Sequence, residues 1–185
     1  MSAVADNICQ RVLKRQFELT WSLLELHLAA LDPATDLLWE PAVHCWTMHQ
    51  GPDGRWMPDF AETEPDPIPV PTIAWLTWHI GWWWTAAVAS VKGGIPPDIR
   101  TTRWPGPNEE TLRWLHRIRS EWQEVFHQVN DADLARPVAV PWSAAEGHSL
   151  ADLLAWVNAE LMKNAAEIGQ LRILRNAGTG AEKST

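Results

Sequence analysis

Five tryptophans lie within ten residues in the segment 75–84, and this cluster constrains the fold more than any other feature. Pro71 ends the preceding segment, and the Thr72 hydroxyl can cap free backbone N–H groups, so a helix is predicted over residues 72–92. A helix with large aromatic side chains on most of its sides cannot be buried along one stripe. It must be enclosed by other helices or by a second subunit, and we therefore expect a helical bundle that forms a homodimer.

The rest of the chain supports this expectation with helical periodicity and strong helix-end signals. Apolar residues recur at helical spacing in four segments, and proline or glycine breaks separate them. The predicted helices cover residues 5–31, 72–92, 108–129 and 149–176. No strand pattern of convincing length is present, so the predicted fold is all-α, a four-helix bundle. We expect one domain over residues 1–177 and a disordered polar tail over 178–185.

A long connection separates the first two predicted helices. Residues 32–71 contain a strong turn signal at 51–54 and an acidic, proline-rich stretch at 62–71. A connection of this length without regular structure often forms a lid or wall of a site. Trp46 and two histidines, His44 and His49, lie in it.

Composition excludes some functional classes. The formal net charge of −8 disfavours a nucleic-acid-binding surface, which needs clustered basic residues. No signal-peptide pattern is visible at the N-terminus, and His79 and Lys92 interrupt or end the apolar run near 73–91, so no membrane association is expected. The two cysteines, Cys9 and Cys45, form no disulfide framework, which favours a reducing cytoplasm.

A line of polar residues on two predicted helices is the candidate site. Glu160, Asn164 and Glu167 follow one another at i, i+4 and i+7 and share a helix face, while His79 interrupts the apolar wall of the tryptophan-rich helix. In bundles, sites are built from side chains that point inward from facing helices. The line could be a solvent face, a buried hydrogen-bond network, or ligands of a divalent metal. No nucleophile–base pattern, phosphate loop or dinucleotide fingerprint is visible.

Three stretches together resemble a known family. They are the segment 70–80 around His79, the connection 46–69 with its Glu-Pro-Asp-Pro, and the segment 157–168 followed by Leu171-Arg172. The chain resembles the DinB/YfiT-like superfamily of four-helix-bundle metalloenzymes, close to its actinobacterial branch. Members are similar to mycothiol-dependent maleylpyruvate isomerase and to mycothiol or bacillithiol S-transferases.

The resemblance implies a metal site with one ligand on the second helix and two, one turn apart, on the fourth. The matching positions here are His79, Glu160 and Asn164, and the family has histidine where Asn164 stands. An amide oxygen is neutral and weakly basic, so we expect zinc or nickel to bind weakly or not at all. Replacing Asn164 with histidine is expected to strengthen binding.

Two functional hypotheses follow for a small-molecule substrate or ligand. In the first, a metal at His79 and Glu160 activates a low-molecular-weight thiol, as in a mycothiol-type transferase or isomerase, and the connection around Trp46 forms the electrophile pocket. In the second, the chain binds a small apolar or aromatic molecule without metal, and Asn164 hydrogen-bonds the ligand or His79. The candidate pocket residues are Trp46, Trp75, Trp82, Trp83 and Glu167.

Overall fold

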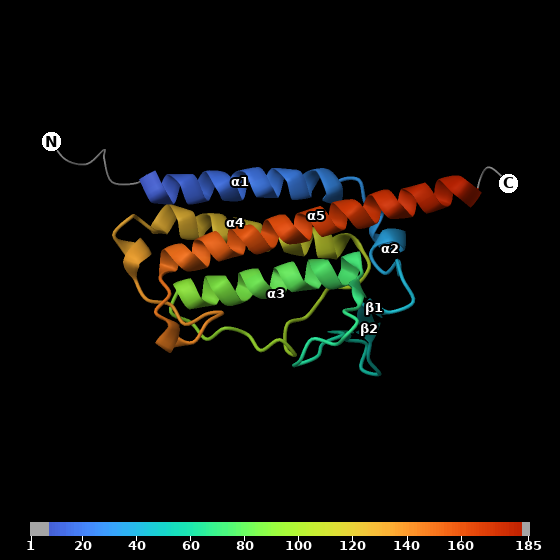
Figure 1. Ribbon diagram of the computed structural model, residues 1–185, viewed down its shortest axis with the longest axis horizontal. Helices are drawn as coiled ribbons and strands as arrows, with labels where there is room; N and C mark the ends of the chain where they lie inside the picture. Colours follow the sequence, from blue (N-terminus) through green and yellow to red (C-terminus); the bar gives the residue numbers. More distant parts are fainter. Residues whose placement is uncertain (1–7, 183–185) are drawn as a thin grey trace.

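Four long helices form one bundle in the computed structural model, which describes residues 8–182. They are α1 (Ile8–Leu28), α3 (Ile73–Val91), α4 (Glu109–Gln128) and α5 (Leu150–Glu182). Figure 1 shows α1 and α5 running in one direction and α3 and α4 in the other. The predicted all-α four-helix bundle is confirmed.

The helix starts lie where the capping residues predict them. The Thr72 hydroxyl accepts from the backbone N–H of Trp75 (3.2 Å), and the Asn108 side chain accepts from that of Glu110 (2.8 Å). Ser149 and Asp152 cap each other at the start of α5, with Ser149 N–H donating to the Asp152 carboxylate (2.8 Å).

The other end of α5 differs from the prediction. The helix continues past the expected end near 176 to Glu182, so most of the predicted polar tail is helical. The remaining tail residues, 183–185, and the predicted start of the first helix at 5–7 lie outside the described residues.

The connection over 32–71 contains regular structure, so the prediction that it has none was wrong. The short helix α2 (Pro33–Asp36) is followed by β1 (Cys45–Trp46), β2 (Met48–Gln50), β3 (Trp56–Pro58) and β4 (Val70–Pro71). Strand β1 pairs in parallel with β4, and β2 pairs antiparallel with β3. Strands of two or three residues are too short to produce a recognisable alternation in sequence. The β1–β4 ladder places Trp46 beside Pro71, at the start of α3.

The connection from α4 to α5 contains two short 3-10 helices. They are η1 (Asp133–Ala135) and η2 (Ala144–Glu146).

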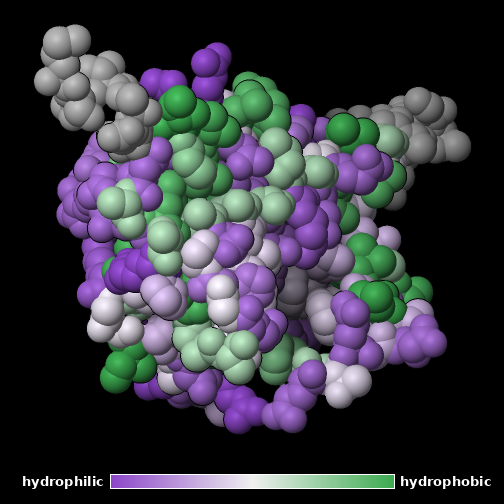
Figure 2. Space-filling view, turned by 60° about the vertical axis from the view of Figure 1, so that its left-hand side comes forward, coloured by the Kyte–Doolittle hydropathy of each residue, from purple (hydrophilic) through white to green (hydrophobic). Residues whose placement is uncertain are grey.

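Within one chain, the other helices enclose the tryptophan-rich helix α3. Trp78 and Trp84 are fully buried, and the Trp84 ring lies 5.5 Å from that of Trp21 and 5.8 Å from that of Phe17 on α1. Burial of α3 therefore needs no second subunit. Large apolar side chains that stay exposed lie on the outer side of α1, in the connections and on α5. On the face drawn in Figure 2, apolar and polar residues are interspersed.

None of the described helices combines the length and the hydropathy that crossing a bilayer requires.

Candidate functional site

His79 on α3 has protein partners at both ring nitrogens. Nδ1 lies 3.2 Å from Oδ1 of Asn164 on α5, and Nε2 accepts a hydrogen bond from Nε1–H of Trp83 at 2.5 Å. Trp83 follows His79 by four residues, so one helical turn brings its indole beside the imidazole. The rings meet edge to face, 5.7 Å apart at an interplanar angle of 89°.

These partners fix the tautomer of His79. An indole N–H can only donate, so Nε2 carries no proton and Nδ1–H donates to Asn164. The Asn164 amide in turn donates through Nδ2 to Oε2 of Glu167 at 3.0 Å. The four residues therefore form a directional hydrogen-bond chain from Trp83 through His79 and Asn164 to the Glu167 carboxylate. We call it the His79 chain.

Burial keeps the His79 imidazole neutral. Although its edge retains some solvent exposure, the ring is surrounded by protein, and burial lowers its pKa from 6.5 to about 4. The hydrogen bond with Asn164 raises the pKa, and the nearby positive charge of Lys163 lowers it further. At neutral pH the ring carries one proton, on Nδ1.

Glu160 does not join the His79 chain. Its carboxylate lies 3.2 Å from the ammonium of Lys163, one turn further along α5. Glu160, Asn164 and Trp83 all line a small cavity of about 10 Å³ between α3 and α5. That volume is about enough for one water molecule, so the space beside Asn164 cannot hold a substrate.

Tryptophan rings surround His79 on its outer side. Trp75 stacks on the imidazole (4.8 Å between centroids, 14° between planes), and Trp46 of β1 stacks on Trp75 (5.1 Å, 26°). Trp82 lies 4.3 Å from Trp83. The predicted pocket tryptophans thus form one continuous aromatic wall around His79.

The sequence did not identify one end of this wall. Trp156 of α5 meets Trp83 edge to face at 4.3 Å, and Trp142 contacts Trp156 at 5.9 Å. Trp156 lies within the helix predicted over residues 149–176, but its contact with Trp83 depends on helix packing. Trp142 lies in an irregular connection with no periodicity to place it.

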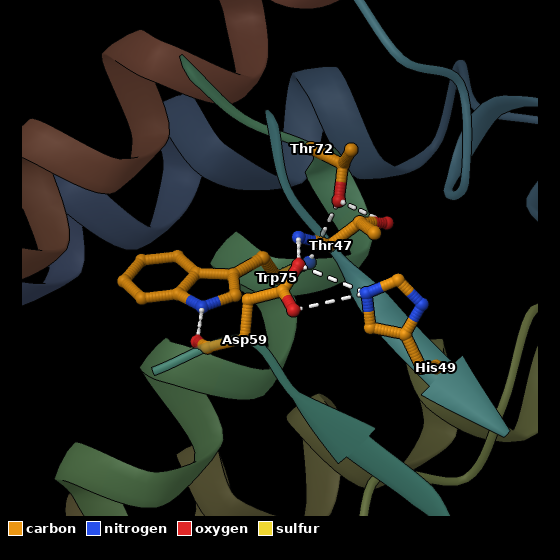
Figure 3. Close-up of polar contacts among 5 residues, drawn as sticks. All are labelled: Thr47, His49, Asp59, Thr72 and Trp75. Carbon is orange, nitrogen blue, oxygen red and sulfur yellow. Dashed lines mark hydrogen bonds and ion pairs between the residues drawn. The ribbon is translucent and has the colours of Figure 1, made fainter. Parts of the chain in front are cut away.

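Asp59 attaches the long connection to α3 (Figure 3). Its carboxylate accepts from the backbone N–H of Thr47 (2.8 Å) and lies 2.9 Å from His49 Nε2. Its backbone carbonyl accepts from Nε1–H of Trp75 (2.8 Å), and the Thr72 hydroxyl donates to that of Thr47 (3.2 Å). These bonds hold Trp75 in place against His79.

A shallow groove lies at the acidic end of the His79 chain. It encloses about 220 Å³, and its walls come from β4 and from the C-terminal half of α5. The lining residues are Val70, Pro71, Glu167, Gln170, Leu171 and Leu174. Glu167 supplies the one charged side chain of this lining, so the groove is apolar with a carboxylate on its wall. We call it the Glu167 groove.

Three further histidines, His44, His49 and His148, lie in the connections between the long helices. His44 is exposed, and His49 faces Asp59. His148 stacks on Trp142 at 4.0 Å and lies within 4.0 Å of carboxylate oxygens of Glu146 and Asp152.

The sequence profile of the DinB superfamily matches residues 16–168, which is most of the chain. The chain belongs to the DinB superfamily. No curated protein and no solved structure matches it.

The DinB-like resemblance implies a divalent metal, but the residues present do not fit one. His79 Nε2 already accepts from Trp83, and Nδ1 carries the proton, so neither nitrogen offers a lone pair. Asn164 contributes a neutral amide oxygen, and Glu160 faces Lys163. Among the described residues, no three His, Cys, Asp or Glu side chains converge as a metal-binding group.

Proposed function

We propose that this chain is a metal-independent member of the DinB superfamily that binds a small molecule with an apolar body and a basic amine. One observation carries the proposal: Trp83 donates to His79 Nε2 and thereby also forces the proton onto Nδ1. A metal would have to displace the indole from one nitrogen or remove the proton from the other.

The lining of the Glu167 groove favours a ligand with an apolar body and a basic amine. Among the described residues, no Lys or Arg pairs with the Glu167 carboxylate, which accepts one hydrogen bond from Asn164. The surrounding Val70, Leu171 and Leu174 offer apolar contact, and a carboxylate in such a wall favours a cation. The groove begins beside the aromatic wall, because Pro71 pairs with Trp46 in the β1–β4 ladder.

The test titrates four proteins with zinc, by calorimetry and thermal melts. We expect no binding by the native protein. Unlike the expectation from the sequence, we also expect none by Asn164→His alone, because Trp83 still holds His79 in its present tautomer. The double variant Trp83→Phe/Asn164→His should bind zinc and melt at a higher temperature with it. Trp82→Phe/Asn164→His is the matched control, since the Trp82 indole donates to the carbonyl of Pro97 and not to His79.

A second arm of the same experiment uses phenethylamine and phenylacetate in EDTA, followed by tryptophan fluorescence. The amine should bind more tightly than the acid, and Glu167→Gln should remove the preference. Tight zinc binding by the native protein would overturn metal independence and favour the thiol-transferase hypothesis. Binding of neither probe would overturn the proposed ligand class.

A further inference from the structure

A second hollow lies between α1 and α4, and its lining carries charges of both signs. It encloses about 550 Å³ and shares no lining residue with the Glu167 groove. The ionisable side chains in its walls are Glu25 of α1 and His116 and Arg119 of α4. None of them takes part in the His79 chain. We call this space the α1–α4 hollow.

Arg119 has no partner for its charge among the described residues. The Cζ atom of its guanidinium lies 5.1 Å from the centre of the Trp21 ring on α1, and this cation–π contact holds the half-buried side chain in place. Its Nε is enclosed by protein atoms and donates to no acceptor. An arginine keeps its charge and offers five N–H donors. The unpaired guanidinium therefore favours a ligand with a carboxylate, which it can bind through two parallel hydrogen bonds.

Glu25 supplies the opposite charge on the α1 wall. Its Oε1 lies 3.5 Å from Nε2 of His116, and its Oε2 is enclosed without a hydrogen-bond partner. The His116 ring also meets the Trp21 ring edge to face at 5.4 Å. Because α1 and α4 run in opposite directions (Figure 1), Glu25 and Arg119 lie on either side of His116 and form no ion pair with each other. An incompletely paired carboxylate in a protein wall favours a cationic group.

A ligand with only one of these charges fits the α1–α4 hollow poorly. An anion at Arg119 is repelled by the nearby Glu25, and an amine at Glu25 is repelled by Arg119. A zwitterion pairs with both charges at once. The rest of the α1 wall offers apolar contact, from Leu26, which is 67% exposed, and from the short side chains of Ala29 and Ala30.

We propose that the α1–α4 hollow binds a small free amino acid with an aliphatic side chain. Its carboxylate pairs with Arg119, its ammonium group pairs with Glu25, and its side chain lies against Leu26. This site is separate from the groove that the proposed function uses, so each can be tested without the other.

The experiment compares L-leucine with two analogues that each lack one of its charges, 4-methylpentanoate and 3-methylbutylamine. Calorimetric titrations use the Glu167→Gln protein, so that an amine bound in the Glu167 groove adds no heat. Leucine should bind about tenfold more tightly than either analogue, because each analogue leaves one charge of the hollow unpaired and is repelled by it.

Substitutions in the same protein assign the two charges. Arg119→Gln should weaken leucine binding about tenfold without weakening that of the amine, and Glu25→Gln should weaken leucine binding about tenfold without weakening that of the acid. The matched controls are Arg117→Gln and Glu18→Gln, which remove the same charges from exposed positions outside the hollow and should keep the affinity.

Circular dichroism and thermal melts check that each variant is folded, since Arg119 packs on Trp21. Arg119→Lys keeps the positive charge and should lose less affinity than Arg119→Gln. No binding of leucine, or an analogue that binds as tightly as leucine, would overturn the proposal. Equal losses in Arg119→Gln and Arg117→Gln would also overturn it, because they would mean that net charge and not the hollow attracts the ligand.

Discussion

At the scale of single residues, Trp83 determines what His79 can do. Its indole N–H donates to Nε2, so the imidazole carries its proton on Nδ1 and donates from there to Asn164. The Asn164 amide in turn donates to the Glu167 carboxylate. A histidine in this state accepts neither a metal nor a proton readily, because its lone pair is used inside the protein. The histidine that the resemblance matches to a metal ligand therefore orders a hydrogen-bond chain between two helices.

The lowered pKa of His79 predicts a specific pH dependence of stability. The unfolded ring titrates near 6.5 and the folded ring near 4, so the unfolded state binds more protons between these values. The stabilisation from the neutral ring is complete above pH 6.5 and is lost as the pH falls from 6.5 to 4. By linkage, about 3 kcal/mol of unfolding free energy depends on this step. Urea unfolding at pH 7 and pH 4.5 should show a larger loss for native protein than for His79→Gln, and equal losses would contradict the prediction.

Much of this residue-scale arrangement could be predicted from spacing. The i, i+4, i+7 line on α5 and the facing His79 did indicate a shared site, and a buried hydrogen-bond network was one of its interpretations. Spacing could not decide between the network and a metal site, because that choice depends on side-chain rotamers and on the distance between α3 and α5. Trp83 was assigned to the pocket wall, although its N–H is the group that completes the chain.

At the scale of elements, the sequence predicts helices better than strands because helix signals are local. Three helix starts are marked by capping residues whose side chains bond to groups two or three positions further along the chain: Thr72, Asn108 and Ser149. The β1–β4 ladder joins Cys45 to Val70 across the whole connection, and a pairing between distant two-residue segments leaves no local periodicity. The extension of α5 was missed because Gly178 and Gly180 resemble a helix stop.

A single glycine sets the distance between α3 and α4. A Cβ at Gly81 would lie 1.8 Å from a ring atom of Trp114, so the two helices touch where Gly81 has no side chain. Gly81→Ala should therefore destabilise the bundle by about 1–3 kcal/mol, despite the better helix propensity of alanine. Gly178→Ala on α5 is the control: a Cβ there meets nothing within 4 Å, and it should cost no stability. Thermal melts of both variants check the prediction, and an unchanged or raised midpoint for Gly81→Ala would refute it.

At the scale of the whole molecule, the chain consists of a packed bundle and a connection laid against one end of it. The bundle buries its aromatic core between four helices. The connection over 45–71 is held by its two short strand pairs, by buried Met48 and by polar bonds around Asp59 (Figure 3). Such a segment can open locally while the rest of the protein stays folded. Because Trp46 and the carbonyl that holds Trp75 belong to this segment, its opening would expose His79 and the aromatic wall together.

This division predicts that Asp59→Ala loosens the connection without unfolding the bundle. The variant loses the carboxylate bonds to Thr47 and His49 but keeps the backbone bonds, so local opening should become about tenfold more frequent. Trypsin should then cleave after Arg55, in the β2–β3 hairpin, about tenfold faster than in native protein. Cleavage after Lys92, at the exposed end of α3, is the internal control and should keep its rate. Faster cleavage at both sites, or a loss of helical circular dichroism at 25 °C, would mean that the connection and the bundle open as one unit.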